Sequence, residues 1–541
     1  MARAYLNYAQ SVTSTPQTQP IPGREAEMVE NNAGGFGFVL DDWERLNRFL
    51  ILGSDGGTYY VSEKNLTAQN AAVVIRCIKA DGPRVVAAAL DVNVNNRAPK
   101  TDPQLFALVL CMAHGDDATK TAVRAAAPQV LRTGTHLLHF VAMLDSLGGW
   151  NRSKRRVIAD WFGQQPDRLA YQMLKYQNRD GWTMRDALRV THPDPLTEQH
   201  DAIFAWACGK VTENEALFLP DILAKHTHML AADDLTPVQK ALWGIGNGLP
   251  REALPTEALT NLFVQRALLP QTPIHALIRN LGNWTASGLL TDSEMVALAA
   301  TKIVDKGALR KARVHPFAIL LATLVYRSGA GFRGSKTWVP QKQILSALED
   351  AYDLAFDYVE PSNKRILIGV DVSGSMHAAC VGTPVFASTA AAAMALTLAR
   401  MEPHATVVRF DTQVRDVVAI TKRSGIASIE SRHGGGTDLT APLRWAGSCK
   451  APYDAVILLT DNETWAGSGH PAQMLQTYRR AVGLPVKLIC CAMAANHANV
   501  VDPADPLQFG CAGLDAHLPS LVADFIGRDV KNPVDEKRKK K

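Results

Sequence analysis

The sequence predicts an array of paired α-helices, an α-solenoid, followed by a doubly wound, Rossmann-like α/β domain. Residues 41–358 show almost only helical patterns, whereas residues 365–528 alternate apolar strands with helices. The composition is that of a globular protein, with 47% hydrophobic and 20% charged residues among 541. We expect residues 1–40 to form an extended lead-in, 359–364 a linker, and 529–541 a basic, disordered tail.

Short helices separated by turn residues fill the first of these domains. One buried helix face has the spacing i, i+3, i+4, i+7 at Ala71, Val74, Ile75 and Ile78. Three helix starts carry a capping box, in which a Thr caps the helix and a Glu or Gln three residues later reaches back: Thr212 with Glu215, Thr236 with Gln239, and Thr291 with Glu294. So many short helices favour a solenoid of stacked pairs over an irregular helical globule, because one core seldom serves so long a region.

Four apolar runs predict the parallel strands of the second domain, with a helix over residues 388–399. The predicted strands are residues 365–370, 405–410, 455–459 and 485–490. Strands that alternate with helices form an open sheet, and such sheets bind ligands beyond the carboxyl ends of their strands.

Five oxygen-bearing residues lie where such a site is expected. Asp371, Ser373 and Ser375 follow the first strand, Thr437 follows three glycines, and Asp461 follows the third strand. One or two carboxylates with several hydroxyls suit Mg²⁺, a hard cation, and not zinc, which prefers nitrogen and sulfur. We expect a divalent-cation site with one open position, which the carboxylate of a partner protein completes. The alternative is a site that is empty or purely structural.

Residues 151–190 are locally basic, with nine Lys or Arg against four Asp, in a chain whose net charge is only +5. Four side chains are spaced to share a face of one helix that ends at Gly181: Arg168, Gln172, Lys175 and Arg179. Cations beside aromatic rings (Tyr171, Tyr176, Trp182) suit single-stranded RNA, because cations neutralise phosphates and rings stack on bases. The alternative is an ordinary solvated helix face with the aromatic residues in the core.

Several classes of protein are disfavoured. The first residues do not form the apolar segment of a secretory signal, and the uncharged stretch Val372–Ala399 contains Pro384 and many small residues, unlike a membrane span. The eight cysteines show no CxxC spacing, which predicts free thiols in a reducing cytoplasm and no zinc site. An enzyme is not expected, because the metal site has too few carboxylates for two metals and no general base stands out.

Three stretches resemble the TROVE domain, which defines the Ro autoantigen family. They are residues 175–192, from Lys175-Tyr176 through Gly181-Trp182 to His192; residues 43–60, with Trp43-Glu44-Arg45 and Gly56-Gly57-Thr58-Tyr59-Tyr60; and residues 132–161, with Arg132-Thr133-Gly134-Thr135-His136 and Ala159-Asp160-Trp161. In the second domain, the loop from Asp371 to Ser375, Thr437 and Asp461 resemble the metal-ion-dependent adhesion site of a von Willebrand factor A (vWA) domain. The resemblance covers nearly the whole chain.

The resemblance implies a closed ring of HEAT-like helix pairs over residues 41–358 and a vWA domain over residues 365–528. In such a ring the outer basic surface binds the stems of Y RNAs. The central hole admits the single-stranded 3′ ends of misfolded or immature RNA. A ring closed within one chain implies a monomer.

Carried over by position, the Y RNA contacts of the family fall on Lys175, Arg179 and His192. Arg185 stands where the family has a Lys, which keeps the charge. Met184 stands where the eukaryotic pattern has a His, so that contact departs from the family. Arg168 extends the same basic face, and Arg132 is a candidate for the hole.

These observations lead to two hypotheses of function. In the first, the chain is a non-catalytic RNA-binding scaffold for RNA quality control or maturation, with an exoribonuclease as partner. In the second, the metal site is the centre of a protein-interaction module, and the helical region is an adaptor. The first hypothesis predicts that RNA binding weakens steeply with salt, because contacts to phosphates supply most of the affinity.

Overall fold

The structure, a computed structural model, describes most of the chain. The described residues are 14–54, 63–98, 100–331, 335–355, 361–378, 386–421, 424–431, 434–449, 451–493, 498–512, 522 and 525–527. The Gly56–Tyr60 stretch, the start of the predicted linker and the basic tail lie outside these residues. No helix within the described residues combines the length and hydropathy that a membrane span needs.

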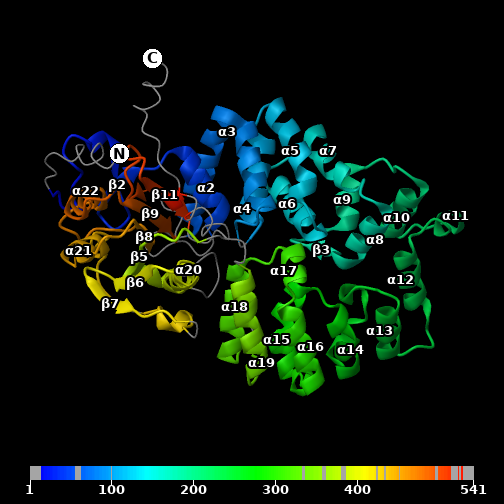
Figure 1. Cartoon of the computed structure of the whole chain (residues 1–541). Helices are drawn as coiled ribbons and strands as arrows, with labels where there is room; N and C mark the ends of the chain where they lie inside the picture. The colour runs from blue at the N-terminus through cyan, green and yellow to red at the C-terminus, as the bar shows by residue number, and fades with distance from the viewer. Residues whose placement is uncertain are drawn as a thin grey trace, which may run out of the picture.

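The helices form two rows, which Figure 1 shows leaving the α/β domain, crossing at α12 and returning. The first row contains α2 (Asp42–Leu52), α3 (Glu63–Val94), α4 (Asp102–His114), α5 (Asp117–Val130), α6 (Gly134–Ser146), α7 (Arg152–Trp161), α8 (Pro166–Lys175), the hairpin β3 (Asn178–Arg179) and β4 (Trp182–Thr183), α9 (Met184–Thr191), α10 (Glu198–Cys208) and α11 (Glu213–Ala216).

After α12 (Asp221–Ala231), the second row returns toward the α/β domain. It contains α13 (Pro237–Gly246), α14 (Leu262–Leu268), α15 (Ile274–Ala286), α16 (Ser293–Ile303), α17 (Lys306–Ala312), α18 (Pro316–Ser328) and α19 (Lys342–Leu354). The α/β domain closes the predicted ring, because its strand β11 contacts α2 and its helix α20 contacts α19.

Local capping determines where several helices begin. The predicted capping boxes at Thr212 and Thr236 are present. The box predicted at Thr291 is wrong, because the carboxylate of Asp292 caps α16 instead and accepts the amide of Glu294 at 2.9 Å. The short Asp side chain next to the first helical residue takes the N-cap position, so the Thr before it lies outside the helix.

The α/β domain is built on a six-stranded sheet in the order β11-β9-β8-β5-β6-β7. Its strands are β5 (Ile366–Asp371), β6 (Ala405–Phe410), β7 (Val414–Val418), β8 (Ala455–Thr460), β9 (Lys487–Ala492) and β11 (Gln508–Ala512). β7 runs antiparallel to β6, and the other neighbours are parallel. Because β5 pairs with β6 on one side and β8 on the other, the sheet order reverses there, which is where ligands bind in such folds.

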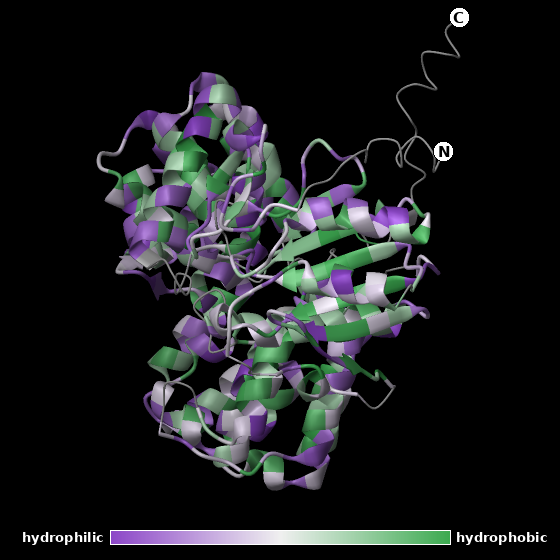
Figure 2. Ribbon diagram, turned by 90° about the vertical axis from the view of Figure 1, so that its left-hand side faces the viewer, coloured by the Kyte–Doolittle hydropathy of each residue, from purple (hydrophilic) through white to green (hydrophobic). Residues whose placement is uncertain are grey.

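Alternate residues of the central strands serve two hydrophobic cores. Helix α20 (Ala387–Met401) packs on one face of the sheet with Ile366 and Ile368 of β5, whereas α21 (Ala441–Ser448) and α22 (Pro471–Val482) pack on the other with Leu367. The first core continues into the helical ring, so the two domains share it. Figure 2 shows the strands as strongly hydrophobic ribbons. Burial of each such side chain contributes about 2 kcal/mol, so this shared core fixes where the domains meet.

The described part of the predicted lead-in, residues 14–40, is more than an extended segment. Strands β1 (Met28–Glu30) and β2 (Phe36–Val39) form an antiparallel hairpin, and β2 also pairs with β10 (Ala498–Asn499). These strands were not predicted from the sequence, because both are short and β10, which pairs with β2, lies near the other end of the chain.

The substitution Tyr352→Phe tests the contact between the ring and the α/β domain. The buried Tyr352 hydroxyl of α19 donates a hydrogen bond to the Ala393 carbonyl of α20 at 3.0 Å. We expect the free energy of unfolding to fall by about 1 kcal/mol, because a buried hydrogen bond is lost. Urea denaturation followed by tryptophan fluorescence measures the difference, and unchanged stability would contradict this contact.

Candidate nucleic-acid interface and metal centre

The hairpin between α8 and α9 carries part of the predicted basic face. Helix α8 ends at Lys175, and Arg179 lies on β3. Between β3 and β4, Asp180 and Gly181 both have a positive φ, 51° and 80°, as a two-residue type I′ turn requires. The helix predicted to run through Arg179 to Gly181 is therefore wrong. The Asp-Gly pair is the sequence signal that indicates the hairpin.

The cations predicted to bind RNA on this face lie on three successive elements. Arg168 and Lys175 lie on α8, Arg179 on β3, Arg185 on α9, and His192 at the end of α9. Lys175 is half-buried and the other four are exposed. None of the five has an ion-pair partner among the described residues, so each can meet an anion from outside.

Lys175 lies beside two tyrosine rings at the edge of a pocket. Its Nζ is 5.4 Å from the ring centroid of Tyr171 and 5.7 Å from that of Tyr176, and it donates to the Tyr171 hydroxyl at 3.3 Å. Burial alone would lower the pKa of Lys175, but Tyr176, Tyr171 and Glu252 outweigh burial and raise it. Lys175 therefore stays charged. Glu252 and Thr272 of the second row also line the pocket.

Some residues of the basic stretch are structural. Lys154 is buried, and its Nζ donates to the carbonyls of Gly148 and Gly149 at 2.8 and 2.9 Å. Gln172, predicted on the exposed helix face, is buried instead, and its side-chain oxygen accepts the Gly134 amide at 2.9 Å. These two side chains satisfy backbone groups and are not open to RNA.

The aromatic residues divide between the two interpretations of this region. Trp182 lies against Trp150, with ring centroids 5.7 Å apart, and packs on the hydrophobic core, as the alternative interpretation predicts. Met184 is also buried and does not replace the missing His contact. Tyr176 is half-buried and packs on the same core as Trp182. Tyr171 is half-buried and remains a candidate for stacking on bases.

A second group of cations forms where α17 approaches the first row of helices (Figure 1). Arg132 follows α5 and Arg313 follows α17, and each has a buried guanidinium nitrogen without a hydrogen-bond partner among the described residues. Burial, and then the charge of Arg313, lower the pKa of Arg132. Burial, and then Arg132, lower the pKa of His136 to about 4. Two uncompensated guanidinium groups near each other favour an anion.

Arg313 was not among the residues predicted from the sequence. It stands in a basic run, Arg310-Lys311-Ala312-Arg313, which was the available signal. What the sequence could not indicate was that this run faces Arg132, because the two lie on opposite rows of the ring.

The predicted metal ligands lie at the edge of the sheet where the strand order reverses. All five are buried: Asp371, Ser373, Ser375, Thr437 and Asp461. The Asp371 carboxylate accepts the Ser373 amide at 2.9 Å and the Thr460 hydroxyl at 2.6 Å. The hydroxyl oxygens of Ser373 and Ser375 are 3.3 Å apart. The side chains from the ends of β5 and β8 therefore converge on one place.

Two buried carboxylates at this edge fit a bound cation. Burial raises the pKa of Asp371. Burial, followed by the charges of Asp371 and Glu463, raises the pKa of Asp461 well above its usual range. A cation at this position would offset both the burial of the two carboxylates and the repulsion between them. The described residues contain no cluster of three or more His, Cys, Asp or Glu. A cation held here would therefore need hydroxyl oxygens as further ligands, which Mg²⁺ accepts.

Two further features of this edge were missed from the sequence. Asp411 is buried and directly follows β6. Burial alone would raise its pKa, but Arg415, whose Nε donates to it at 2.7 Å, and the Gln413 amide together lower it. The loop of Thr437 is joined to the edge by a hydrogen bond from the Gly374 amide to the Gly435 carbonyl at 3.3 Å. Asp411 directly follows a predicted strand, which was the available sequence signal.

Family models match both halves of the chain. The model described as the TROVE domain matches residues 29–219 and 247–328, and the model described as the Ro60 vWA domain matches residues 365–526. The helical rows and the sheet therefore correspond to these two domains. Together, the helical rows and the six-stranded sheet define a TROVE–vWA protein.

Known proteins resemble the chain over nearly its whole length. It is 38% identical over 525 residues to RNA-binding protein RO60 of Deinococcus radiodurans, with 95% of this chain and 98% of that protein covered. It is 31% identical over 583 residues to the protein of the same name from Caenorhabditis elegans, with 92% and 90% covered. The crystal structure of the D. radiodurans RO (RSR) protein matches with a TM-score of 0.68 and 37% identity, covering 90% of this chain and 99% of that one. The chain belongs to the Ro60 family.

Lys154→Met separates structural from exposed cations in the basic stretch. Removal of the ammonium leaves the buried carbonyls of Gly148 and Gly149 without their donor, so we expect the free energy of unfolding to fall by about 1–3 kcal/mol. The exposed neighbour in the matched control Arg155→Met should change it by less than about 0.5 kcal/mol. Urea denaturation compares the two, and equal stability would refute the structural role of Lys154.

Proposed function

We propose that the chain is a non-catalytic RNA-binding scaffold. The observation that carries this proposal is the succession of cations on α8, β3 and α9 without ion-pair partners among the described residues. Such cations neutralise phosphates of a folded RNA, and release of its counterions supplies affinity. Two relatives are named RNA-binding proteins. We infer that the ligand of this outer face is a Y-like small RNA.

A second RNA contact is proposed between the rows. The buried nitrogens of Arg132 and Arg313 favour a phosphate over any neutral ligand, because an anion would satisfy both charges. We assign this group to the single-stranded 3′ end of misfolded or immature RNA. RNA held at both places would be retained for an exoribonuclease, which serves quality control or maturation.

Replacement of three cations tests the outer contact. The variant is Lys175→Ala/Arg179→Ala/His192→Asn; Asn is chosen at position 192 because the φ of 46° there is left-handed, which Asn tolerates. We expect the affinity for a structured small RNA with a single-stranded 3′ tail to fall at least about tenfold. Its salt dependence should become shallower, because fewer counterions are released. Gel-shift titrations at two salt concentrations measure both.

The matched control is Lys364→Ala/Arg480→Ala/His404→Asn, which removes one exposed Lys, Arg and His from the α/β domain. It should bind RNA like the wild type. Equal affinity of the wild type and both variants would contradict an RNA contact on this face. An equal loss in both variants would show that total charge alone decides binding, which also contradicts the proposal.

We also propose that the vWA domain binds Mg²⁺, because two buried carboxylates converge there. This metal site is the alternative centre of function. Asp371, Ser373, Ser375, Thr437 and Asp461 would hold the ion. The ion would supply a positive charge with one open position. A carboxylate of a partner protein would fill that position and dock the partner on the RNA scaffold.

Asp461→Asn tests the metal site through stability. Without a cation, the substitution removes one of two neighbouring buried charges, so we expect the melting temperature in EDTA to stay the same or rise. With the cation, the wild type should gain stability by mass action, and the variant should gain much less. Thermal denaturation in EDTA and in MgCl₂ measures both effects. An identical Mg²⁺-dependent rise in the two proteins would refute the site.

A further inference from the structure

Residues 14–36, called the N-terminal segment below, lie against the loop that follows Asp461. Gln17 contacts Asp438, 421 residues further along the chain. Neither family match covers residues 14–28. Membership of the family therefore does not explain what the contacts of this segment do.

Gln17 is the centre of these contacts, and it is completely buried. Its Nε2 donates to Asp438 Oδ1 at 2.9 Å and to the Gly469 carbonyl at 3.0 Å, and its Oε1 accepts a hydrogen bond from the Thr464 hydroxyl. Its backbone amide donates to the Gly467 carbonyl at 3.0 Å. Both amide protons and the amide oxygen are used, as a buried polar side chain requires.

Gln17 approaches residue 467 so closely that any side chain there would displace Gln17 or Asp438. A Cβ on Gly467 would lie 2.1 Å from Gln17 Nε2 and 2.4 Å from Asp438 Oδ1. A Cβ on Gly35 would lie 1.8 Å from the Thr464 carbonyl oxygen. The N-terminal segment and the loop 463–469 thus pack closely, with a glycine of the loop at one contact and a glycine of the segment at the other.

These contacts reach two of the candidate metal ligands. Asp438 directly follows Thr437, and the Thr437 carbonyl accepts the amides of Trp465 and Ala466 at 3.2 and 3.1 Å. The carboxylate of Asp461 accepts the Glu463 amide at 3.0 Å. Gln17 therefore joins the segment that carries Thr437 to the loop that follows Asp461.

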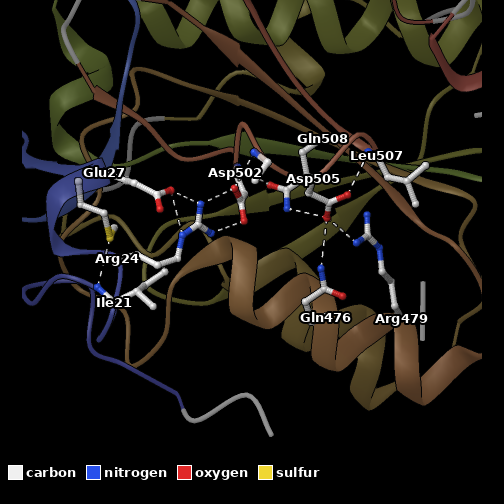
Figure 3. A network of polar contacts seen from close by, with 11 residues as sticks. Ile21, Arg24, Glu27, Gln476, Arg479, Asp502, Asp505, Leu507 and Gln508 are labelled. Atoms are coloured by element: carbon white, nitrogen blue, oxygen red, sulfur yellow. Dashed lines mark hydrogen bonds and ion pairs between the residues drawn. The ribbon is translucent and has the colours of Figure 1, made fainter. Parts of the chain in front are cut away.

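Other side chains hold the N-terminal segment in this place. Asn31 donates to the Thr464 carbonyl, and Asn32 donates to Glu463 Oε1, each at 2.8 Å. Figure 3 shows a separate anchor, where the two terminal guanidinium nitrogens of Arg24 donate to Asp502; the bond from Nη2 measures 2.8 Å. The anchor at Arg24 keeps the hairpin on the α/β domain, whereas Gln17 and the two asparagines contact the loop 463–469.

We propose that the N-terminal segment is part of the metal site, with Gln17 as a positioning residue that keeps Thr437 and Asp461 in their ligating arrangement. The inference rests on the proposed Mg²⁺ site. It adds to that site a segment outside residues 365–526, which the vWA family model matches. Linkage makes the effect reciprocal: if the segment favours cation binding, the cation tightens the segment by the same free energy.

Gln17→Glu in the full chain tests this inference. The substitution keeps the shape of the side chain but sets a carboxylate against Asp438, so the two segments should separate. We expect the dissociation constant for Mn²⁺, measured by isothermal titration calorimetry, to rise about tenfold or more, equivalent to about 1.4 kcal/mol. Hydrogen exchange of residues 461–470 should become faster.

The matched control is Gln265→Glu. Gln265 is also a buried glutamine, whose Nε2 donates to the Leu259 carbonyl at 3.1 Å, but it lies on α14 of the ring. Its Mn²⁺ affinity should equal that of the wild type. A further measurement needs no variant: exchange of residues 14–36 in the wild type should slow when Mg²⁺ is added.

The outcomes separate the inference from the proposed metal site. Unchanged Mn²⁺ affinity and unchanged exchange in Gln17→Glu would overturn the positioning role while leaving the metal site intact. Failure of the wild type to bind Mn²⁺ would refute the metal site. In that case faster exchange of residues 461–470 in Gln17→Glu would still support positioning of the loop, and unchanged exchange would overturn it.

Discussion

The two-faced packing of the central sheet is the constraint on which the rest of the structure depends. Residues of β5, β8 and β9 alternate between a core shared with the helical ring and a separate core under α21 and α22. Since a strand presents successive side chains to opposite faces, a slip of one residue would exchange the two cores. The shared core places α2 and α19 on the same domain and closes the ring. The same register sets Asp371 at the reversal point of the sheet.

The two candidate sites reflect opposite electrostatic problems, and in both the protein holds like charges together. At the sheet edge, buried carboxylates face each other, and a cation would resolve the repulsion. Between the rows, Arg132 and Arg313 approach each other, and an anion would do the same. On the outer face of α8, β3 and α9 the cations are mostly exposed, so they would attract RNA at little cost in stability. Under the proposed function, a cation would bind the α/β domain and RNA would bind the helical ring.

Local signals explain what the sequence could predict. Apolar runs located the principal strands. The convergence of Asp371 and Asp461 followed because side chains after neighbouring parallel strands meet at one edge of the sheet. Helix starts at Thr212 and Thr236 were predictable from the residues next to them. The path of the chain near Arg179 was misread because helical spacing was weighed above the turn-forming Asp-Gly pair. The facing of Arg132 and Arg313, and the docking of Gln17 on Asp438, depend on contacts between distant segments, which no local pattern records.

The central claim is that RNA contacts the ring on α8, β3 and α9. Ultraviolet cross-linking of the full chain to a structured RNA with a single-stranded 3′ tail, followed by mass spectrometry, tests it most directly. We expect cross-linked peptides from residues 166–192, with Tyr171 as an attachment point, because aromatic rings that stack on bases cross-link readily. Cross-links confined to the vWA domain, or an even spread over both domains, would contradict the claim.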